Sequence, residues 1–418
     1  MDDLIGTTAA RSPRRARQPD AHIRVSARHV PPVTPAAISR ARGLELGAMS
    51  AESPARPAGD DVGTDPLELM RQRNSLMHSP ASVANGREFT PRASDVFIVT
   101  YPKCGTTWMT QLCHQIRCVR HAKKLGMPAS ATAYDESAKP GECFSMRFGE
   151  ITEVVPWDIL AMDCDQNLDD EQFLTGQEPF AKTPLVPRLF KSHETARNVA
   201  RGAKYVCVAR DPADVFFSFY EFLPAYMGLE RGAVSMEAFC DAIFAGASHS
   251  GDLWSHFLGW LDRRDENASR LAESKKKTEN DVLMVSFEAM KADPRGVARR
   301  LGTFLKTEPG DEELSETDLD FVVGMSGFER MRLDASKFDD HFVRRKMWTR
   351  VGIPERDWRG GGVGKVREGG GRVGGGRAGL PESVRLKIAE KWAEIMAPRG
   401  FETYADFRDA VDAPGDDG

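Results

Sequence analysis

Four short apolar runs place the strongest constraint on the fold of this chain. They read VFIVT over Val96–Thr100, RLFK over Arg188–Lys191, YVCVA over Tyr205–Ala209 and VLMVSF over Val282–Phe287. Each run is nearly continuous and rich in β-branched or aromatic residues, which is typical of strands buried on both faces of a parallel sheet. Helical patterns, such as Thr107–Val119 and Asp211–Leu223, lie between the runs. We therefore predict an α/β fold with a doubly wound, mainly parallel sheet flanked by helices.

The end of the first predicted strand carries the strongest chemical signal, because ligands of doubly wound folds bind beyond the carboxyl ends of the strands. There the chain reads Thr100-Tyr101-Pro102-Lys103-Cys104-Gly105-Thr106-Thr107-Trp108. Gly105 permits a tight turn into a helix. The first N–H groups of that helix then converge with the Lys103 ammonium and the hydroxyls of Thr106 and Thr107, which predicts an anion site suited to phosphate. The alternative is a Thr-capped helix beside a surface lysine. Because the lysine precedes the glycine, the turn is not the GxxxxGK[ST] P-loop.

A second candidate anion site follows the third strand. Arg210 ends that strand, Asp211 is placed to cap a helix, and Pro212 suits the first turn of the helix. Ser218 lies two turns along the same helix face. Arg210 and Ser218 can therefore hold one anion, although a structural salt bridge is the alternative for Arg210.

The second predicted strand ends in Phe190-Lys191-Ser192-His193. Because side chains alternate along a strand, Lys191 and His193 share a face. A lone histidine is usually structural or solvated. One that shares a strand end with a lysine, near two anion sites, is a candidate general base.

The order and spacing of these motifs resemble those of the cytosolic sulfotransferases, which use 3′-phosphoadenosine 5′-phosphosulfate (PAPS). The shared motifs are Tyr-Pro-Lys-x-Gly-Thr-Thr-Trp from Tyr101, Lys-x-His from Lys191 and Arg-Asp-Pro-x-Asp-x-x-x-Ser from Arg210. The resemblance extends over Pro66 to Arg408. It includes Phe287–Pro294, which is similar to the family's Tyr-Glu-Asp-Met-Lys-x-x-Pro stretch. It implies the P-loop-like fold of the family and PAPS as co-substrate, with no metal.

The resemblance also implies a cofactor site. The loop for the 5′-phosphosulfate would comprise Lys103, Cys104, Gly105, Thr106 and Thr107. Trp108 would stack on adenine, and Arg210 with Ser218 would bind the 3′-phosphate. Phe287 replaces the tyrosine that usually helps to hold adenine, and Phe328 could supply an apolar contact with adenine.

For catalysis, the resemblance implies that His193 is the general base for the acceptor hydroxyl. Lys103 would stabilise charge on the departing phosphate oxygen, and Lys191 would support the transferring sulfuryl group. A catalytically inactive protein that binds 3′,5′-ADP is one alternative, although it would not need both Lys191 and His193. A nucleotide kinase or NTPase is the other alternative.

Cys104 stands where the family usually has serine. A thiol beside Lys103 and a helix start could have a depressed pKa. We therefore expect Cys104 to be open to oxidation, with loss of activity in oxidants; an inert buried thiol is the alternative.

The segment 352–379 is rich in glycine. It is either a flexible linker or a loop whose backbone N–H groups close over an anion. Gly371-Arg372-Val373-Gly374 resembles part of the loop with which the family closes over the 3′-phosphate. The basic residue of that loop would be either Arg367 or Arg372.

Charge and composition exclude some classes of protein. The net charge of −5 shows no basic excess that would indicate a nucleic-acid partner. No apolar run approaches the roughly 18–20 residues that span a bilayer. Seven cysteines without CxxC pairs favour a reducing compartment, so we expect a soluble, cytoplasmic protein. Residues 1–65 are predicted to be a disordered extension, with a transit peptide as the alternative, 66–408 the sulfotransferase domain and 409–418 an acidic tail.

The predicted reaction is transfer of a sulfuryl group to a hydroxyl, or less readily an amine, of a small apolar acceptor such as a phenol, a sterol or another alcohol. The expected pocket segments are Ala133–Phe148 and Phe222–Leu229. The side chains expected in the pocket are Phe144, Met146, Tyr220 and Phe222. No dimerisation motif was found, so the oligomeric state stays open.

Overall fold

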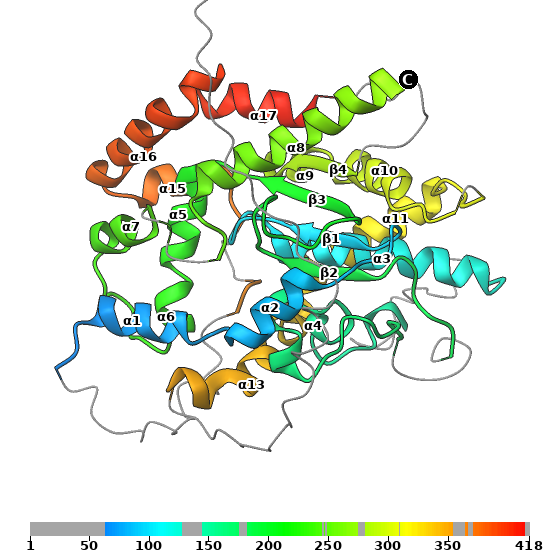
Figure 1. The fold of residues 1–418 in the computed structure, drawn as a ribbon, viewed down its shortest axis with the longest axis horizontal. Helices are drawn as coiled ribbons and strands as arrows, with labels where there is room; N and C mark the ends of the chain where they lie inside the picture. The colour runs from blue at the N-terminus through cyan, green and yellow to red at the C-terminus, as the bar shows by residue number, and fades with distance from the viewer. Residues whose placement is uncertain are drawn as a thin grey trace, which may run out of the picture. The chain divides into compact units, whose positions relative to one another are not determined.

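A parallel sheet of four strands organises the fold (Figure 1). The computed structural model describes residues 63–127, 144–174, 182–244, 246, 249–274, 281–308, 310–353, 364–366 and 371–413. All of these residues belong to one compact unit, Ala55–Gly418. The predicted extension 1–65 lies outside the described residues up to residue 62.

The four strands are β1 (Val96–Val99), β2 (Leu189–Ser192), β3 (Lys204–Ala209) and β4 (Val282–Ser286). Their order in the sheet is β2-β1-β3-β4, and every pair is parallel. The chain therefore leaves the central strand β1 toward one edge and returns to build the other side, which makes the sheet doubly wound. The carboxyl ends of β1, β2 and β3 meet at this switch point, where ligands bind in such folds. The predicted fold class and the four strands are confirmed.

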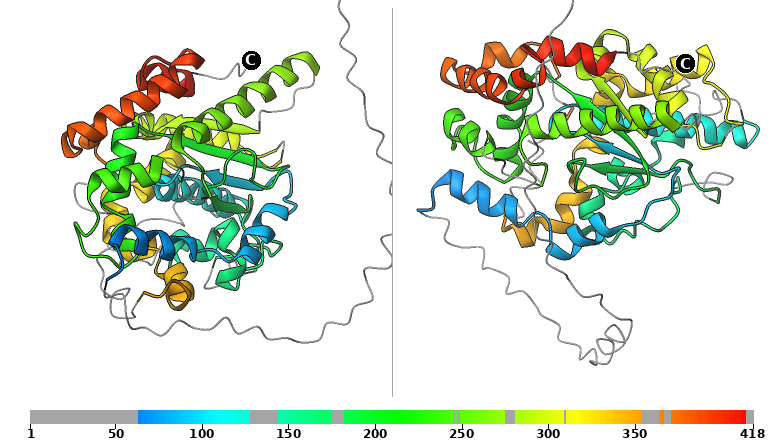
Figure 2. Two further views of the ribbon diagram at one scale, coloured as in Figure 1. Left: turned by 60° about the vertical axis from the view of Figure 1, so that its left-hand side comes forward. Right: turned by 45° about the horizontal axis from the view of Figure 1, so that its top comes forward.

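Helices cover both faces of the sheet (Figure 2). The helices before β3 are α1 (Pro66–Ser75), α2 (Pro80–Glu88), α3 (Thr106–Lys124) and α4 (Ile151–Val154). Those between β3 and β4 are α5 (Pro212–Tyr220), α6 (Leu223–Tyr226), α7 (Met236–Phe244) and α8 (Leu253–Ser274). After β4 come α9 (Phe287–Ala292), α10 (Pro294–Phe304), α11 (Glu316–Ser326), α12 (Phe328–Leu333), α13 (His341–Val351), α15 (Gly375–Gly379), α16 (Glu382–Ile395) and α17 (Tyr404–Asp412).

Aromatic side chains join one face of the sheet to its helices. Phe97 of β1 lies opposite Phe190 and Tyr205 in the strand register, and its ring stacks on both at centroid distances of 5.0 and 6.0 Å. Phe89, which follows α2, packs 5.5 Å from Phe190, and Trp260 of α8 lies 5.3 Å from Tyr205. Such pairs stabilise beyond the burial of their area.

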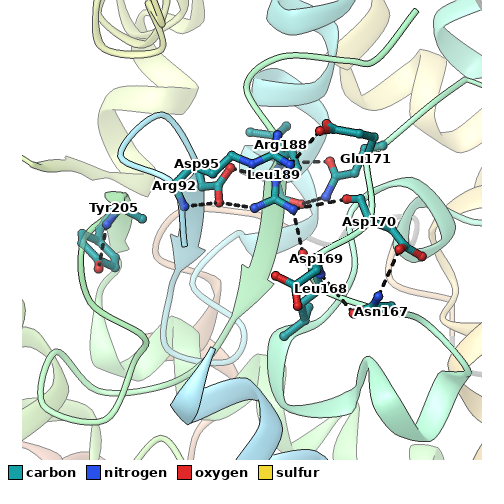
Figure 3. A network of polar contacts seen from close by, with 12 residues as sticks. Arg92, Asp95, Asn167, Leu168, Asp169, Asp170, Glu171, Arg188, Leu189 and Tyr205 are labelled. Carbon is teal, nitrogen blue, oxygen red and sulfur yellow. Dashed lines mark hydrogen bonds and ion pairs between the residues drawn. The ribbon is translucent and has the colours of Figure 1, made fainter. Parts of the chain in front are cut away.

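A buried ion pair joins the amino ends of β1 and β2 (Figure 3). The guanidinium of Arg188 donates to both carboxylate oxygens of Asp95, at 2.9 and 2.6 Å. Arg188 also donates to the carbonyl oxygens of Leu168 and Asp170. Asp95 in turn accepts from the N–H of Arg92. The network lies at the end of the strands opposite the ligand-binding edge.

Helix α1 reaches the same part of the fold as α6 (Figure 1). It begins at Pro66, where the Asp65 side chain accepts from the N–H of Glu68. Arg73 of α1 donates to the carbonyl of Met227, at the end of α6, at 2.8 Å. At the other end of the chain, α17 extends to Asp412, four residues into the predicted tail 409–418. No helix of the described segments is both long and apolar enough to cross a bilayer.

Candidate active site

The loop after β1 turns sharply into α3, as predicted. Lys103 and Gly105 both have positive φ, 72° and 106°. A Cβ at Gly105 would lie 2.8 Å from the Phe287 ring, so glycine is required for the approach as well as for the turn. No side chain caps α3, so its first N–H groups are available at the end of the helix. The Thr106 hydroxyl is hydrogen-bonded to that of Thr100. The Lys103 ammonium lies 3.6 Å from the Phe222 ring centroid.

Cys104 does not line the cavity that Lys103 and His193 border, and the predicted low pKa of its thiol is wrong. The side chain is fully buried, and this burial raises the pKa of Cys104 well above its ordinary value, although Arg210 opposes the shift. Desolvation of a thiolate outweighs the nearby positive charge here. The backbone N–H of Cys104 donates to the carbonyl of Tyr101 and is used in the turn rather than offered to an anion.

His193 follows β2 and is held in one tautomer. Its Nδ1 lies 2.7 Å from the carbonyl oxygen of Thr100, which can only accept, so Nδ1 carries the proton and Nε2 is left as an acceptor. The ring meets the edge of Trp157 at 5.0 Å. Burial, and then the charge of Lys191, hold the pKa of His193 well below its ordinary value. The imidazole is therefore neutral near pH 7 and ready to take a proton.

Lys191 is the buried cation beside His193. Its ammonium lies 3.8 Å from the Trp157 ring centroid and 3.6 Å from Oδ1 of Asp340. Burial lowers the pKa of Lys191 to about 8, while Asp340 opposes the shift. Lys191 is thus mostly charged at pH 7.

Arg210 joins the loop after β1 to the glycine-rich segment. Its guanidinium donates to the carbonyl of Lys103 at 2.9 Å and to that of Arg372 at 3.4 Å. It also stacks on the Phe287 ring, 4.3 Å from the centroid. The side chain is 5% exposed, and its Nε has no hydrogen-bond partner among the described residues. Asp211 caps α5 by accepting from the N–H of Ala213, as predicted.

Aromatic rings line the far end of the same cavity. Trp108 and Phe287 meet edge to face at a centroid distance of 5.7 Å. Phe328, at the start of α12, is 39% exposed and also borders the cavity. These rings give this part of the cavity wall an aromatic surface, on which a planar base can stack.

The described part of the glycine-rich segment from Gly371 onward is packed structure, so the linker alternative is wrong there. Gly371 has a φ of 68° and lies against Phe287. The N–H groups of Gly374 and Gly376 donate to the carboxylate of Asp214 at 2.9 and 2.6 Å. A Cβ at Gly376 would lie 2.1 Å from a backbone oxygen of α5, so only glycine allows this approach. The Arg372 side chain is exposed, and Arg367 lies outside the described residues.

Most of the predicted site residues line one cavity of about 430 Å³. The predicted residues on its wall are Lys103, Gly105, Thr106, Thr107, Trp108, Lys191, His193, Arg210, Ser218, Phe287, Phe328 and Gly371. Cys104 and Arg372 do not line it. The anion loop, the candidate base and the aromatic surface therefore share one space.

Of the four side chains predicted to line the acceptor pocket, only Phe222 lines the cavity. Leu223 and Tyr226 from the same segment line it as well. Phe144 and Met146 are buried in the core instead, and the Tyr220 hydroxyl donates to the carbonyl of Val234 away from the cavity wall. The predicted segment Ala133–Phe148 lies outside the described residues up to residue 143.

Several polar residues of the cavity wall were not predicted from the sequence. They include four titratable residues, His78, His249, Asp340 and Lys365. The His78 ring packs against those of Trp157 and His249, and burial lowers the pKa of His78 to about 3. Lys365 stands in the glycine-rich segment, whose basic residues were a usable signal. No local pattern marks the other three.

The family model that matches this chain, and two of its relatives, are described as sulfotransferases. Residues 93–347, more than half of the chain, match the family model described as sulfotransferase domain. Cytosolic sulfotransferase 16 of Arabidopsis thaliana is 27% identical over 252 residues, which are 60% of this chain and 64% of the relative. Luciferin sulfotransferase of Photinus pyralis is 27% identical over 271 residues, 65% of each chain. The chain thus spans slightly less than two thirds of these relatives. The crystal structure of mouse sulfotransferase SULT7A1 with PAP is similar at a TM-score of 0.45 and 16% identity, covering 77% of this chain and 90% of that chain.

Proposed function

The chain belongs to the sulfotransferase domain family, and on this premise we propose that it transfers a sulfuryl group from PAPS to a hydroxyl, or less readily an amine, of a small molecule. The observation that carries the proposal is the single cavity that joins the Lys103 loop to a neutral, oriented His193. An anion site alone would suit many nucleotide-binding proteins. An anion site that shares its space with a proton acceptor suits group transfer.

The residues at the nucleotide end fit PAPS. The open N–H groups of α3 and the Lys103 ammonium would hold the 5′-phosphosulfate. Arg210 and Ser218 would hold the 3′-phosphate: both line the cavity, the Asp214 carboxylate is a long 3.9 Å from the buried guanidinium of Arg210, and Nε of Arg210 has no hydrogen-bond partner among the described residues. Trp108 and Phe287 would hold adenine. PAPS supplies an activated sulfuryl group when it is bound.

His193 is the proposed general base. Its Nε2 takes the proton of the acceptor hydroxyl while Nδ1 stays bonded to Thr100. A general base of this kind typically contributes about 10²–10⁴ in rate. Lys103 and Lys191 would place positive charge where negative charge develops, and the burial of Lys191 strengthens its effect.

The acceptor is proposed to be a phenol, a sterol or a similar alcohol. The cavity has the size of a small-molecule site, for which about 300–1,000 Å³ is usual. Apolar side chains on its acceptor side include Met77, Phe222, Leu223 and Ile243. Asn74, His78 and Ser250 add polar groups to this wall.

Calorimetry with 3′,5′-ADP, compared with ATP and magnesium, tests the co-substrate. We expect selective binding of 3′,5′-ADP, followed by transfer of label from ³⁵S-labelled PAPS to members of a panel of phenols, sterols and amines. Selective binding of ATP would instead support a phosphotransferase, and transfer to no member of the panel would remove the proposed acceptor class.

A further inference from the structure

Two lysines share one buried carboxylate beside His193. The Lys191 ammonium lies 3.6 Å from Oδ1 of Asp340, and the Lys365 ammonium forms an ion pair with Oδ2. The three side chains are 6%, 12% and 3% exposed, in the order Lys191, Lys365 and Asp340. Lys191 belongs to β2, Lys365 to the glycine-rich segment, and Asp340 directly precedes α13. All three side chains line the cavity. Three distant parts of the chain therefore meet at the candidate base.

The cluster carries more positive than negative charge. Each lysine lowers the pKa of Asp340, which stays ionised despite its burial. A further acid, Glu150, interacts electrostatically with all three side chains, and its pKa is raised to about 7, by burial first and then by Asp340, so it is partly protonated at neutral pH. Two positively charged ammonium groups thus lie beside one fully ionised carboxylate, and all three groups are largely removed from solvent. Such an excess is costly unless an anion joins the site.

We propose that Lys365 contacts the transferring sulfuryl group together with Lys191, and that Asp340 is the positioning residue that holds both ammonium groups beside His193. This inference rests on the proposed function and adds to it a cation that the sequence motifs do not contain. Lys365 and Gly371 line the same cavity, so the described residues of the glycine-rich segment border the space proposed for PAPS.

The chemistry of the step explains the need for a further cation. A bond forms between the acceptor oxygen and sulfur while the bond from sulfur to the bridging phosphate oxygen breaks, and that oxygen keeps the electron pair. The acceptor proton moves to Nε2 of His193. Negative charge persists on the sulfuryl oxygens and grows on the phosphate oxygen, where fixed ammonium groups stabilise it.

PAPS and 3′,5′-ADP differ only by the sulfuryl group. The difference between their affinities therefore measures the contact of Lys365 with that group. In Lys365→Met we expect calorimetry to show about tenfold weaker PAPS binding, the effect of losing one charge-assisted contact, with 3′,5′-ADP affinity changed less than about twofold. Lys365→Arg should recover most of the PAPS affinity. The matched control is Lys346→Met, which breaks an exposed pair with Asp165 at 2.7 Å and should change neither affinity.

The outcomes separate the two proposals. If Lys365→Met leaves PAPS affinity unchanged, or weakens both nucleotides equally, Lys365 does not contact the sulfuryl group while the proposed function stands. If the wild-type protein binds neither nucleotide, the proposed function itself fails and this inference falls with it.

Asp340→Asn tests the positioning role through the pH dependence of PAPS binding. The groups facing Asp340 are Lys191, Lys365, Glu150, His193, Tyr226 and Arg344. Asp340 raises the pKa of Lys191, which is about 8 in the wild-type protein. Removal of the carboxylate lowers this pKa, so the loss of PAPS affinity on raising the pH from 6.5 to 9 should begin at a lower pH. A pH profile identical to that of the wild type would refute the role of Asp340.

Discussion

His193 combines two features that a general base needs, a fixed tautomer and a free nitrogen. Replacement of His193 by alanine should lower kcat by about 10²–10⁴. Binding of 3′,5′-ADP should stay within about twofold of the wild type, because His193 is not one of the proposed nucleotide contacts. Turnover with labelled PAPS and calorimetry measure the two effects. Near-normal turnover in His193→Ala would show that another group accepts the proton.

The pH dependence of turnover should reflect a histidine and a lysine with lowered pKa values. In the proposed mechanism His193 acts in its neutral form, so its lowered pKa should remove the loss of activity that an ordinary histidine, at about 6.5, would cause near pH 6. Lys191 is proposed to act in its charged form, so activity should fall as the pH rises through about 8. Lys191→Arg should abolish the alkaline fall, because arginine stays protonated. An unchanged alkaline fall in that variant would assign it to another group.

Cys104 is predicted to resist oxidation. Its thiol is fully buried with a raised pKa, so little thiolate forms and no oxidant reaches it. The experiment uses Cys143→Ser, since Cys143 is not among the described residues, and the six described cysteines are all buried. Turnover after peroxide treatment should match that of the untreated variant. Loss of activity that Cys104→Ser prevents would contradict this.

Helix α15 depends on its close approach to α5. In Gly376→Ala the added Cβ would lie 2.1 Å from the Ala213 carbonyl oxygen, so α15 must move and take the neighbouring Arg372 contact of Arg210 with it. We expect a lower Tm and at least fivefold weaker binding of 3′,5′-ADP, about 1 kcal/mol. The matched control is Gly324→Ala in α11, where the Cβ meets open space. Equal behaviour of the two variants would mean that α15 does not support the nucleotide site.

Stability of the whole molecule should depend on the Arg188–Asp95 pair more than on any exposed pair of similar geometry (Figure 3). Asp95→Ala leaves a buried guanidinium without its carboxylate, which should lower the free energy of unfolding by about 3–5 kcal/mol. Lys346→Ala, which breaks the exposed pair with Asp165 from the helix α13, should cost less than about 1 kcal/mol. Urea denaturation measures both. Similar losses in the two variants would show that burial does not set the strength of the Arg188 pair.

The sheet and the polar residues at its carboxyl edge could be predicted from local sequence patterns. Each apolar run became a strand whose ends differ from the predicted ones by at most one residue. His193 and Arg210 directly follow their strands and Lys103 lies in the turn after β1, so a parallel sheet brings them to one edge. Periodicity, capping and turn chemistry are properties of neighbouring residues, which is why a linear pattern was sufficient for these features.

Burial of individual side chains and contacts between distant residues could be seen only in the folded protein. The neighbours of Cys104 in sequence suggested a low pKa, but the surrounding core raised it. Phe144 and Met146 looked suited to a pocket, yet packing placed them in the core. Asp340 and Lys365 reach Lys191 from far along the chain. Desolvation and charge pairing depend on atoms that packing brings together, so no local pattern could reveal them.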